Sequence, residues 1–318
     1  MLDAIRFAGG LLLLLGGGEA LVRGASALAL RLGVAPVLIG MTVVAFGTST
    51  PELAVSVIAA RAGSGDIAVG NIVGSNIANI GLLLGLTGLV WRIGVARSIV
   101  TREIPMMLVA LCALSVLATD GADRRLVRTD GILLLLFFSM FVYYSIADAR
   151  RQRAAEQAAG GEGRGPGGGA AALLALAGIA GVVAGGHFLV EGAIGLGRTF
   201  GVSEAVIGLT AVAVGTSLPE LVTTLIAARK GHADIAVGNI VGSNIFNALF
   251  IGGVSASIAP MRLPDHGETD LAVMVAFSLL LLPLALLGRH SLGRPQALLL
   301  LAVYGAYVYT LTLRDNGV

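Results

Sequence analysis

Long apolar runs recur along the whole chain and constrain its fold more than any other feature. Leu11–Leu15, Ile132–Phe138 and Leu279–Leu287 are three examples. Of the 318 residues, 56% are hydrophobic and 13% are charged, whereas a soluble globular domain carries about 25% charged residues. A soluble fold of this size cannot bury so much apolar surface, and a bilayer-spanning helix needs roughly 20 apolar residues. We therefore predict an all-α polytopic membrane protein.

The chain has room for about ten transmembrane helices with short connections. In the first half we expect them near residues 4–30, 34–60, 66–90, 99–119 and 129–148, and in the second half near 170–198, 202–228, 234–258, 271–288 and 296–313. The segment between the halves is rich in Gly, Arg, Ala and Glu, which is typical of a flexible polar linker. The predicted units are a five-helix repeat at 1–148, the linker at 149–169 and a second five-helix repeat at 170–318.

An internal duplication supports this division. Residues 40–85 and 208–253 are identical at 29 of 46 positions, at a constant offset of 168. Because each half holds an odd number of spans, the second copy must enter the membrane in the opposite orientation. Such an inverted repeat is the architecture expected of secondary transporters.

The distribution of basic residues predicts the orientation. With five spans in each half, 13 Lys and Arg residues fall on the linker side of the membrane and 8 on the other. Because cytoplasmic loops carry the excess of basic residues, we expect a cytoplasmic linker and both termini outside a cell (inner) membrane. No basic stripe with interleaved aromatic residues is present, so nucleic acid is not an expected partner. No oligomeric state is predicted.

Polar residues inside the spans are concentrated in the duplicated segments. The second span contains Gly47–Glu52 (GTSTPE), and its counterpart contains Gly215–Glu220 (GTSLPE). The third span contains Gly74–Asn79 (GSNIAN), and its counterpart contains Gly242–Asn247 (GSNIFN). Intramembrane polar residues are costly and usually functional. For the Ser, Thr and Asn residues, however, hydrogen bonding between packed helices stays open as an alternative role.

A proline in each of the first two motifs predicts a broken helix. Pro51 and Pro219 lack a backbone donor and clash with the carbonyl four residues earlier. Carbonyl groups freed at membrane depth persist only where protein buries them or where they line a watered cavity. We therefore expect each of these spans to break near its middle and to expose backbone oxygen atoms to the site.

The motifs offer only oxygen ligands, which indicates the class of ligand. Carboxylate, hydroxyl, amide and carbonyl oxygen atoms suit a hard cation such as calcium. The motifs contain no His or Cys, which argues against zinc, copper or iron. An empty, buried site in which Glu52 and Glu220 were both ionised would be energetically very unfavourable. Calcium, several sodium ions or protons must neutralise them, and competition for the same carboxylates is a mechanism of exchange. No cofactor is expected.

The paired motifs resemble the alpha repeats of the calcium/cation antiporter superfamily, and most closely those of prokaryotic sodium/calcium exchangers. The resemblance implies ten spans as two inverted sets of five, with broken helices 2 and 7 crossing helices 3 and 8 near the midplane. It also implies the ion ligands: Glu52, Glu220, Thr48 and Thr216 for calcium; Ser49, Ser217, Ser75 and Ser243 for sodium; backbone carbonyls of Ala45 and Ala213; and Asn79 at the central position. Asn247 departs from exchangers that carry Asp there, which makes potassium co-transport less expected.

The leading prediction is a sodium/calcium antiporter that exports calcium by alternating access, electrogenically and with spans 1 and 6 sliding across the rest. A proton/calcium antiporter of the same superfamily is the first alternative, but protons need no cage of Ser and Asn side chains. A cation channel is disfavoured by the inverted repeats and the deep two-carboxylate site. An intramembrane protease using Ser49 or Ser217 lacks a His or Lys base in the motifs, so no enzyme is expected.

Overall fold

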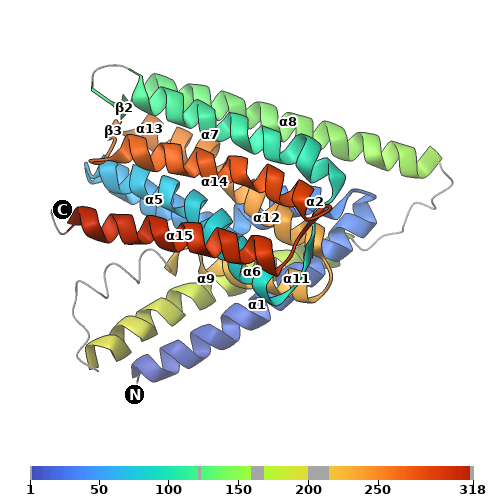
Figure 1. The fold of residues 1–318 in the computed structure, drawn as a ribbon. Coiled ribbons are helices and arrows are strands. Elements are labelled where there is room, and N and C mark those ends of the chain that lie inside the picture. The colour runs from blue at the N-terminus through green and yellow to red at the C-terminus, as the bar shows by residue number, and fades with distance from the viewer. Residues whose placement is uncertain (1, 121–122, 159–167, 200–214, 316–318) are drawn as a thin grey trace.

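The computed structural model of the protein describes residues 2–120, 123–158, 168–199 and 215–315, and these residues are almost wholly helical (Figure 1). The helices of the first half are α1 (Leu2–Leu32), α2 (Pro36–Ile39), η1 (Gly40–Val44), α3 (Ala45–Thr48), α4 (Thr50–Arg61), α5 (Gly65–Ala78), η2 (Asn79–Leu84), α6 (Gly85–Val90), η3 (Ile99–Glu103), α7 (Ile104–Thr119) and α8 (Arg128–Ala158). Those of the second half are α9 (Gly168–Thr199), α11 (Leu218–Arg229), α12 (Ala233–Ile245), η4 (Phe246–Ile251), α13 (Gly252–Ile258), α14 (Gly267–Leu287) and α15 (Arg294–Asp315). The η segments are π-helical.

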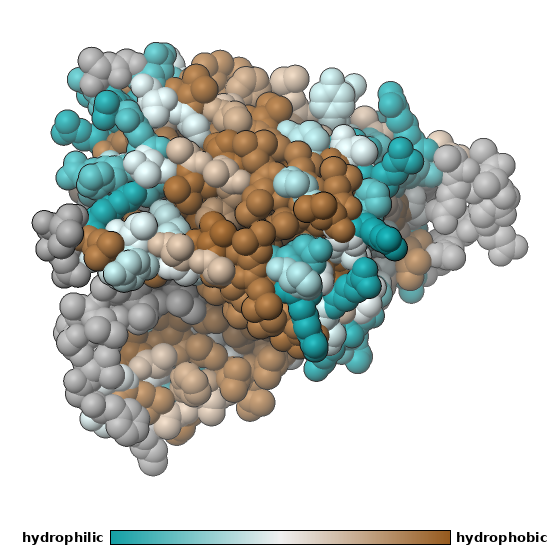
Figure 2. Space-filling model, viewed as in Figure 1, coloured by the Kyte–Doolittle hydropathy of each residue, from teal (hydrophilic) through white to brown (hydrophobic). Residues whose placement is uncertain are grey.

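The membrane spans agree with the predicted ranges within a few residues. Eight of the described helices are long and apolar enough to cross a membrane, and the bent pair Pro36–Thr48 and Thr50–Arg61 makes a ninth. The span predicted at 202–228 begins in residues 200–214, outside the described part of the chain, and its C-terminal part is α11. Figure 2 shows the broad apolar surface that these helices present. The chain is therefore an all-α, multi-span membrane protein.

Two spans, one from each half, form the centre of the molecule. The most apolar window of Ala233–Ile258 is 94% buried, and that of Gly65–Val90 is 72% buried. By contrast, the corresponding windows of Arg128–Gln152 and Arg294–Arg314 are 11% buried. The motifs Gly74–Asn79 and Gly242–Asn247 therefore lie on the two most buried of these spans, while α8 and α15 face the surroundings.

The first polar motif breaks its helix, as predicted. α3 and α4 are separated by Ser49, which has φ −83° and ψ 11°, and the two helical segments meet at a bend of 48°. In the second half, Ser217 has φ −89° and ψ 2° and precedes α11. Pro51 and Pro219 each lie in the first turn of the helix that follows, where a missing N–H leaves no bond unmade. Each proline thus begins a new helix rather than interrupting one.

Helices α1 and α9 pack closely side by side, away from the α8 side of the molecule (Figure 1). Gly10, Gly17 and Gly24 lie along one face of α1, and a Cβ atom on any of them would lie 2.4–2.6 Å from the backbone of α9. The nearest residues of α9 run backwards, from Leu189 beside Gly10 to Ala175 beside Gly24. The two helices are therefore antiparallel, and only glycine permits this approach of their backbones.

Two short antiparallel ribbons connect the halves. β1 (Ile93–Gly94) pairs with β4 (Ser291–Leu292), and β2 (Arg125–Leu126) pairs with β3 (Met261–Arg262). In each ribbon one strand comes from the first half and the other from the second. Because α7 separates β1 from β2 along the chain, the ribbons lie at opposite ends of that span.

The expected linker is partly helical. α8 continues through Ala158 and α9 begins at Gly168, so residues 149–158 belong to a helix. Residues 159–167 lie outside the described part of the chain. Gln152 fixes the extension of α8, because its Oε1 accepts a 2.7 Å hydrogen bond from the Ala35 N–H and its Nε2 donates at 2.7 Å to Asp148.

Candidate functional site

The broken helices and the central spans bring the polar motifs together. α4 packs against α5, α11 against α12, and α3 against α12. Ser49, at the first break, donates a 2.9 Å hydrogen bond to Oε1 of Glu220 and lies 3.0 Å from the hydroxyl of Ser243. Thr48 donates at 3.2 Å to Oδ1 of Asn239. The first break therefore contacts both polar motifs of the second half.

The two glutamates are buried at the centre of this cluster. The exposed fractions of Glu52 and Glu220 are 2% and 1%. Oε2 of each carboxylate has no hydrogen-bond partner among the described residues. Thr216 and Ser217 lie beside the Glu52 carboxylate. Unlike Ser49, Ser217 has a hydroxyl with no hydrogen-bond partner among the described residues. Because an uncompensated buried charge is very costly, this pair of carboxylates needs a bound cation or a proton.

Amide side chains form the next layer. Asn79 Nδ2 donates at 2.9 Å to Oδ1 of Asn244, and Asn244 Nδ2 donates at 3.3 Å to the carbonyl of Asn76. Oδ1 of Asn79 and Oδ1 of Asn247 have no hydrogen-bond partner among the described residues. Asn79 begins the π-helical segment η2, and Asn247 lies in η4. π-Helical turns are frequent at functional sites, and these two amide oxygens lie on such segments. The Oδ1 of Asn76, which also has no hydrogen-bond partner among the described residues, lies on α5.

A second pair of asparagines braces the broken helices instead. Asn71 donates at 2.9 Å to Ser56 and at 3.2 Å to the carbonyl of Glu52, while Asn239 donates at 3.2 Å to Thr224. Ser56 and Thr224 are fully buried and were missed by the sequence reasoning. A signal was available, because each lies one helical turn after the glutamate of its own motif. For Asn71 and Asn239 the structure favours the packing role.

The remaining predicted ligands are placed as follows. Ser75 on α5 is 7% exposed, and Ser243 on α12 is fully buried. The carbonyl of Ala45 lies 3.0 Å from the Ser49 N–H, which donates to it, and 3.4 Å from the Thr48 hydroxyl, a second donor. Ala213 lies outside the described residues.

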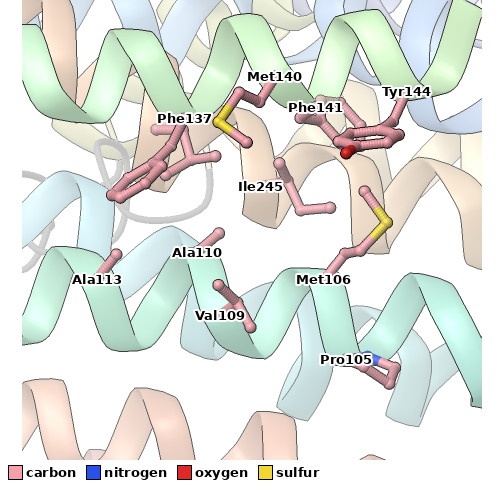
Figure 3. A pocket seen from close by; sticks show the side chains of 11 residues that line it. Pro105, Met106, Val109, Ala110, Ala113, Phe137, Met140, Phe141, Tyr144 and Ile245 are labelled. Carbon is pink, nitrogen blue, oxygen red and sulfur yellow. The ribbon is translucent and has the colours of Figure 1, made fainter.

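The donor set is confined to oxygen. Among the described residues, no cluster of three or more His, Cys, Asp or Glu side chains has the arrangement of a metal site. The cluster around Glu52 and Glu220 thus combines two carboxylates with neutral hydroxyl and amide groups. A separate cavity of about 300 Å³ between α7 and α8 (Figure 3) is lined mainly by apolar groups such as Met106, Phe137 and Met140. It has no charged side chain and cannot bind a cation.

Comparison with known proteins places these motifs in a family. A model described as sodium/calcium exchanger protein matches residues 3–147 and 170–313. The putative antiporter CaxA of Alkalimonas amylolytica is 41% identical over 310 residues, covering 95% of this chain and 96% of its own. The sodium/calcium exchanger MaX1 of Methanosarcina acetivorans is 35% identical over 337 residues, covering 95% and 96%.

A solved structure extends the similarity to the fold. The sodium-calcium exchanger NCX_Mj, soaked with 2.5 mM Na⁺ and 0.1 mM Ca²⁺, matches with a TM-score of 0.85 at 31% identity, over 98% of this chain and 99% of its own. Both halves are matched by the family model, and the similar proteins align over nearly their whole lengths. The chain therefore belongs to the sodium/calcium exchanger family, within the calcium/cation antiporter superfamily.

Proposed function

We propose that this protein is a sodium/calcium antiporter that exports calcium by alternating access. The observation that carries the proposal is the buried pair Glu52 and Glu220, inside a cluster of neutral oxygen atoms. The Oε2 atom of each has no hydrogen-bond partner in the described part of the chain. Such a site binds one divalent cation or several monovalent cations in alternation, because both neutralise the same two charges. MaX1 and NCX_Mj are both named as sodium/calcium exchangers, which supports the same pair of ions.

Each predicted ligand has a role in this proposal. The two carboxylates bind both ions, and most neutral groups are assigned to either calcium or sodium. The calcium ligands are Glu52, Glu220, Thr48 and Thr216; the sodium ligands are Ser49, Ser217, Ser75 and Ser243; and Asn79, Asn247, Ala45 and Ala213 supply amide or backbone oxygen. The free Oδ1 atoms of Asn79 and Asn247 support their place in this set.

We also propose that the two halves are inverted five-span repeats, with the linker cytoplasmic and both termini outside. The antiparallel packing of α1 on α9, which are equivalent helices of the two halves, supports the inversion. The ribbons support it too, because β1 pairs with β4 and β2 with β3, as a two-fold relation between halves requires. The excess of basic residues on the linker side supports the orientation.

The glycine-lined pair α1 and α9 is our candidate for the moving element. Their backbones touch along several turns, so the two helices move together. Sliding of this pair across the breaks at Ser49 and Ser217 would open the site to each side in turn. This step is what separates an antiporter from a channel, in which no such alternation occurs.

Proton/calcium exchange is the alternative, since two buried carboxylates also bind protons. Uptake of calcium-45 into proteoliposomes distinguishes the two. Vesicles loaded with sodium are compared with vesicles loaded with potassium and with vesicles that hold only a pH gradient. We expect uptake only where internal sodium is present. Uptake driven by the pH gradient alone would assign the protein to the proton-coupled branch. It would also contradict the proposal that the four serines are sodium ligands.

A further inference from the structure

A second, basic cavity lies where α6, α14 and α15 meet. It has a volume of about 580 Å³ and is lined by Arg92, Arg289 and Arg294, with no acidic side chain in its lining. In Figure 2, hydrophilic residues gather at the edge of the apolar surface where α14 joins α15. The cavity therefore concentrates positive charge at the boundary of the membrane-facing surface.

No carboxylate of the described residues forms an ion pair with the arginines of this cavity. Arg92 donates from Nε and Nη2 to the Ser291 hydroxyl, at 2.9 and 2.8 Å, and Ser291 donates at 2.5 Å to the carbonyl of Gly288. These hydrogen bonds orient the guanidinium group but remove none of its charge. Arg289 and Arg294 are exposed, and neither forms an ion pair with any described carboxylate.

The backbone fixes the positions of these side chains. Arg289 and His290 have φ values of 52° and 59°, in the left-handed region that non-glycine residues rarely occupy. A Cβ atom on Gly288 would lie 1.7 Å from the carbonyl oxygen of Ser291, so the turn requires glycine. The Val95 N–H donates at 2.8 Å to the carbonyl of His290 and ties the turn to the ribbon β1–β4. The basic cavity is therefore a preorganised part of the fold.

The same cavity has an apolar rim. Val90 and Leu287 line it and have exposed fractions of 57% and 78%. Both residues end membrane spans, so their exposed side chains face lipid. A ligand that fits must place a negative charge beside the arginines and an apolar part along this rim, which excludes a simple inorganic anion as the best fit.

The opposite end of the molecule provides an internal comparison. There, next to the ribbon β2–β3, a cavity of about 460 Å³ is lined by residues of both signs, namely Asp123, Arg124, Arg262, Asp265 and Glu268. Arg124 pairs with Glu268 at 2.9 Å. The duplication of the chain therefore does not by itself produce a basic cavity, and the charge is particular to one end.

We propose that the basic cavity binds the phosphodiester headgroup of an anionic phospholipid. Guanidinium groups bind phosphate oxygens through paired, charge-assisted hydrogen bonds. Basic pockets between transmembrane helices are suited to anionic headgroups. The glycerol and the first acyl methylenes lie along Val90 and Leu287. The site is separate from the glutamates, so the proposal does not depend on which ions are transported.

Native mass spectrometry of the full-length protein in detergent tests this site. Phosphatidylglycerol and phosphatidylcholine with identical acyl chains are titrated separately, and inorganic phosphate is added in a competition arm. The test variant is R92Q/R289Q/R294Q, and R124Q/R262Q at the opposite end is the matched control. We expect preferential binding of phosphatidylglycerol, a loss of affinity of at least about tenfold in the triple variant, and a change within about twofold in the control.

Each contrary outcome overturns the proposal. Equal binding of the two lipids would show that the cavity does not recognise the headgroup. Equal affinities of the triple variant and the control would show that the arginines do not contribute to binding. Displacement of phosphatidylglycerol by millimolar phosphate would make the ligand a free anion instead. If the triple variant does not fold, R294Q alone must lower the affinity by about fivefold, since Arg294 is exposed and unpaired among the described residues.

Discussion

Glu52 and Glu220 occupy equivalent positions in the two halves, and each lies beside the Thr–Ser pair of the other half's motif. Ser49 donates to Glu220, and Ser217 lies beside Glu52. Each carboxylate is therefore held by residues that are distant in sequence. Assembly of the proposed ion site therefore depends on the docking of the two halves.

Replacement of either glutamate by glutamine keeps the shape of the side chain and removes its charge. Because calcium binding needs both charges in a buried site, we expect E52Q and E220Q each to lower calcium-45 uptake by at least about 100-fold. The folded state should persist, since the substitution also removes an uncompensated buried charge.

The matched control for these two variants is E268Q. Glu268 is exposed and pairs with Arg124 at the molecular end, so uptake should stay near that of the unmodified protein. Thermal unfolding in detergent verifies that each variant is folded. Full uptake by either E52Q or E220Q would contradict the assignment of the site.

The serines of the central spans test the division of ligands. Ser75 and Ser243 are buried, neutral hydroxyl donors on α5 and α12. We expect S75A/S243A to raise the sodium concentration for half-maximal exchange by about tenfold. The calcium concentration for half-maximal exchange should rise much less, because both carboxylate ligands of calcium are still present. Initial rates at graded sodium and calcium measure the two separately. A larger effect on calcium than on sodium would contradict the sodium role.

At the scale of helices, the breaks were predictable from sequence because their cause is local. Pro51 and Pro219 restrict their own backbone and that of the preceding residue. The partners of the polar side chains were not predictable, because Asn71 bonds Ser56 while Asn79 bonds Asn244 in the other half. Which partner an asparagine bonds depends on how the helices pack. Two asparagines of the same span are the same residue type, so the local sequence does not distinguish their partners.

The C-terminal end of α8 shows a different limit. Its apolar run ends near residue 148, and hydropathy therefore placed the end of the helix there. The helix continues to Ala158 because Arg, Gln, Ala and Glu are good helix formers in water. Hydropathy reports where the membrane ends, and helix propensity together with the Gln152–Ala35 hydrogen bond decides where the helix ends.

Adjacent glycines of α1 provide a prediction for the α1–α9 pair. A Cβ atom on Gly17 would lie 2.6 Å from the backbone of Gly181, whereas a Cβ atom on Gly16 has nothing within 4 Å. We expect G17A to destabilise the protein by about 1–3 kcal/mol and G16A to stabilise it by about 0.5–1 kcal/mol, as for alanine in an open helix position. Unfolding in denaturant measures both. Equal effects would show that the two helices do not pack on this face.

For the whole molecule, the sequence predicted the positions and order of the described spans but not how the halves are joined. The two ribbons and the glycine faces are contacts between distant segments, each only a few residues long, and their sequences are not distinctive. The duplication did predict a symmetric partner for each motif. The residue types of the proposed site could therefore be predicted from the sequence, whereas their contacts could not.

The proposed orientation can be tested by labelling single cysteines in a C112S background. Asp265 and Arg97 are exposed at opposite ends of the spans. We expect a membrane-impermeant maleimide to label the Asp265→Cys variant in intact cells, and the Arg97→Cys variant only after permeabilisation. The same pattern with the sites exchanged would reverse the orientation. Labelling of both from outside would contradict the odd number of spans predicted between Arg97 and Asp265.

In the electrogenic exchange that we predict, the sodium ions carry more charge than the calcium ion, so at least one net positive charge would move in each cycle. Each such charge corresponds to about 2.3 kcal/mol per 100 mV, or about a 50-fold change in the equilibrium calcium ratio. In sodium-loaded vesicles, calcium entry then carries positive charge outwards. An inside-positive potential, set by valinomycin and an inward potassium gradient, should accelerate uptake, and an inside-negative potential should slow it. Rates that do not change with voltage would instead indicate that two monovalent cations exchange for each calcium ion. That exchange keeps the two buried carboxylates neutralised and moves no net charge across the membrane.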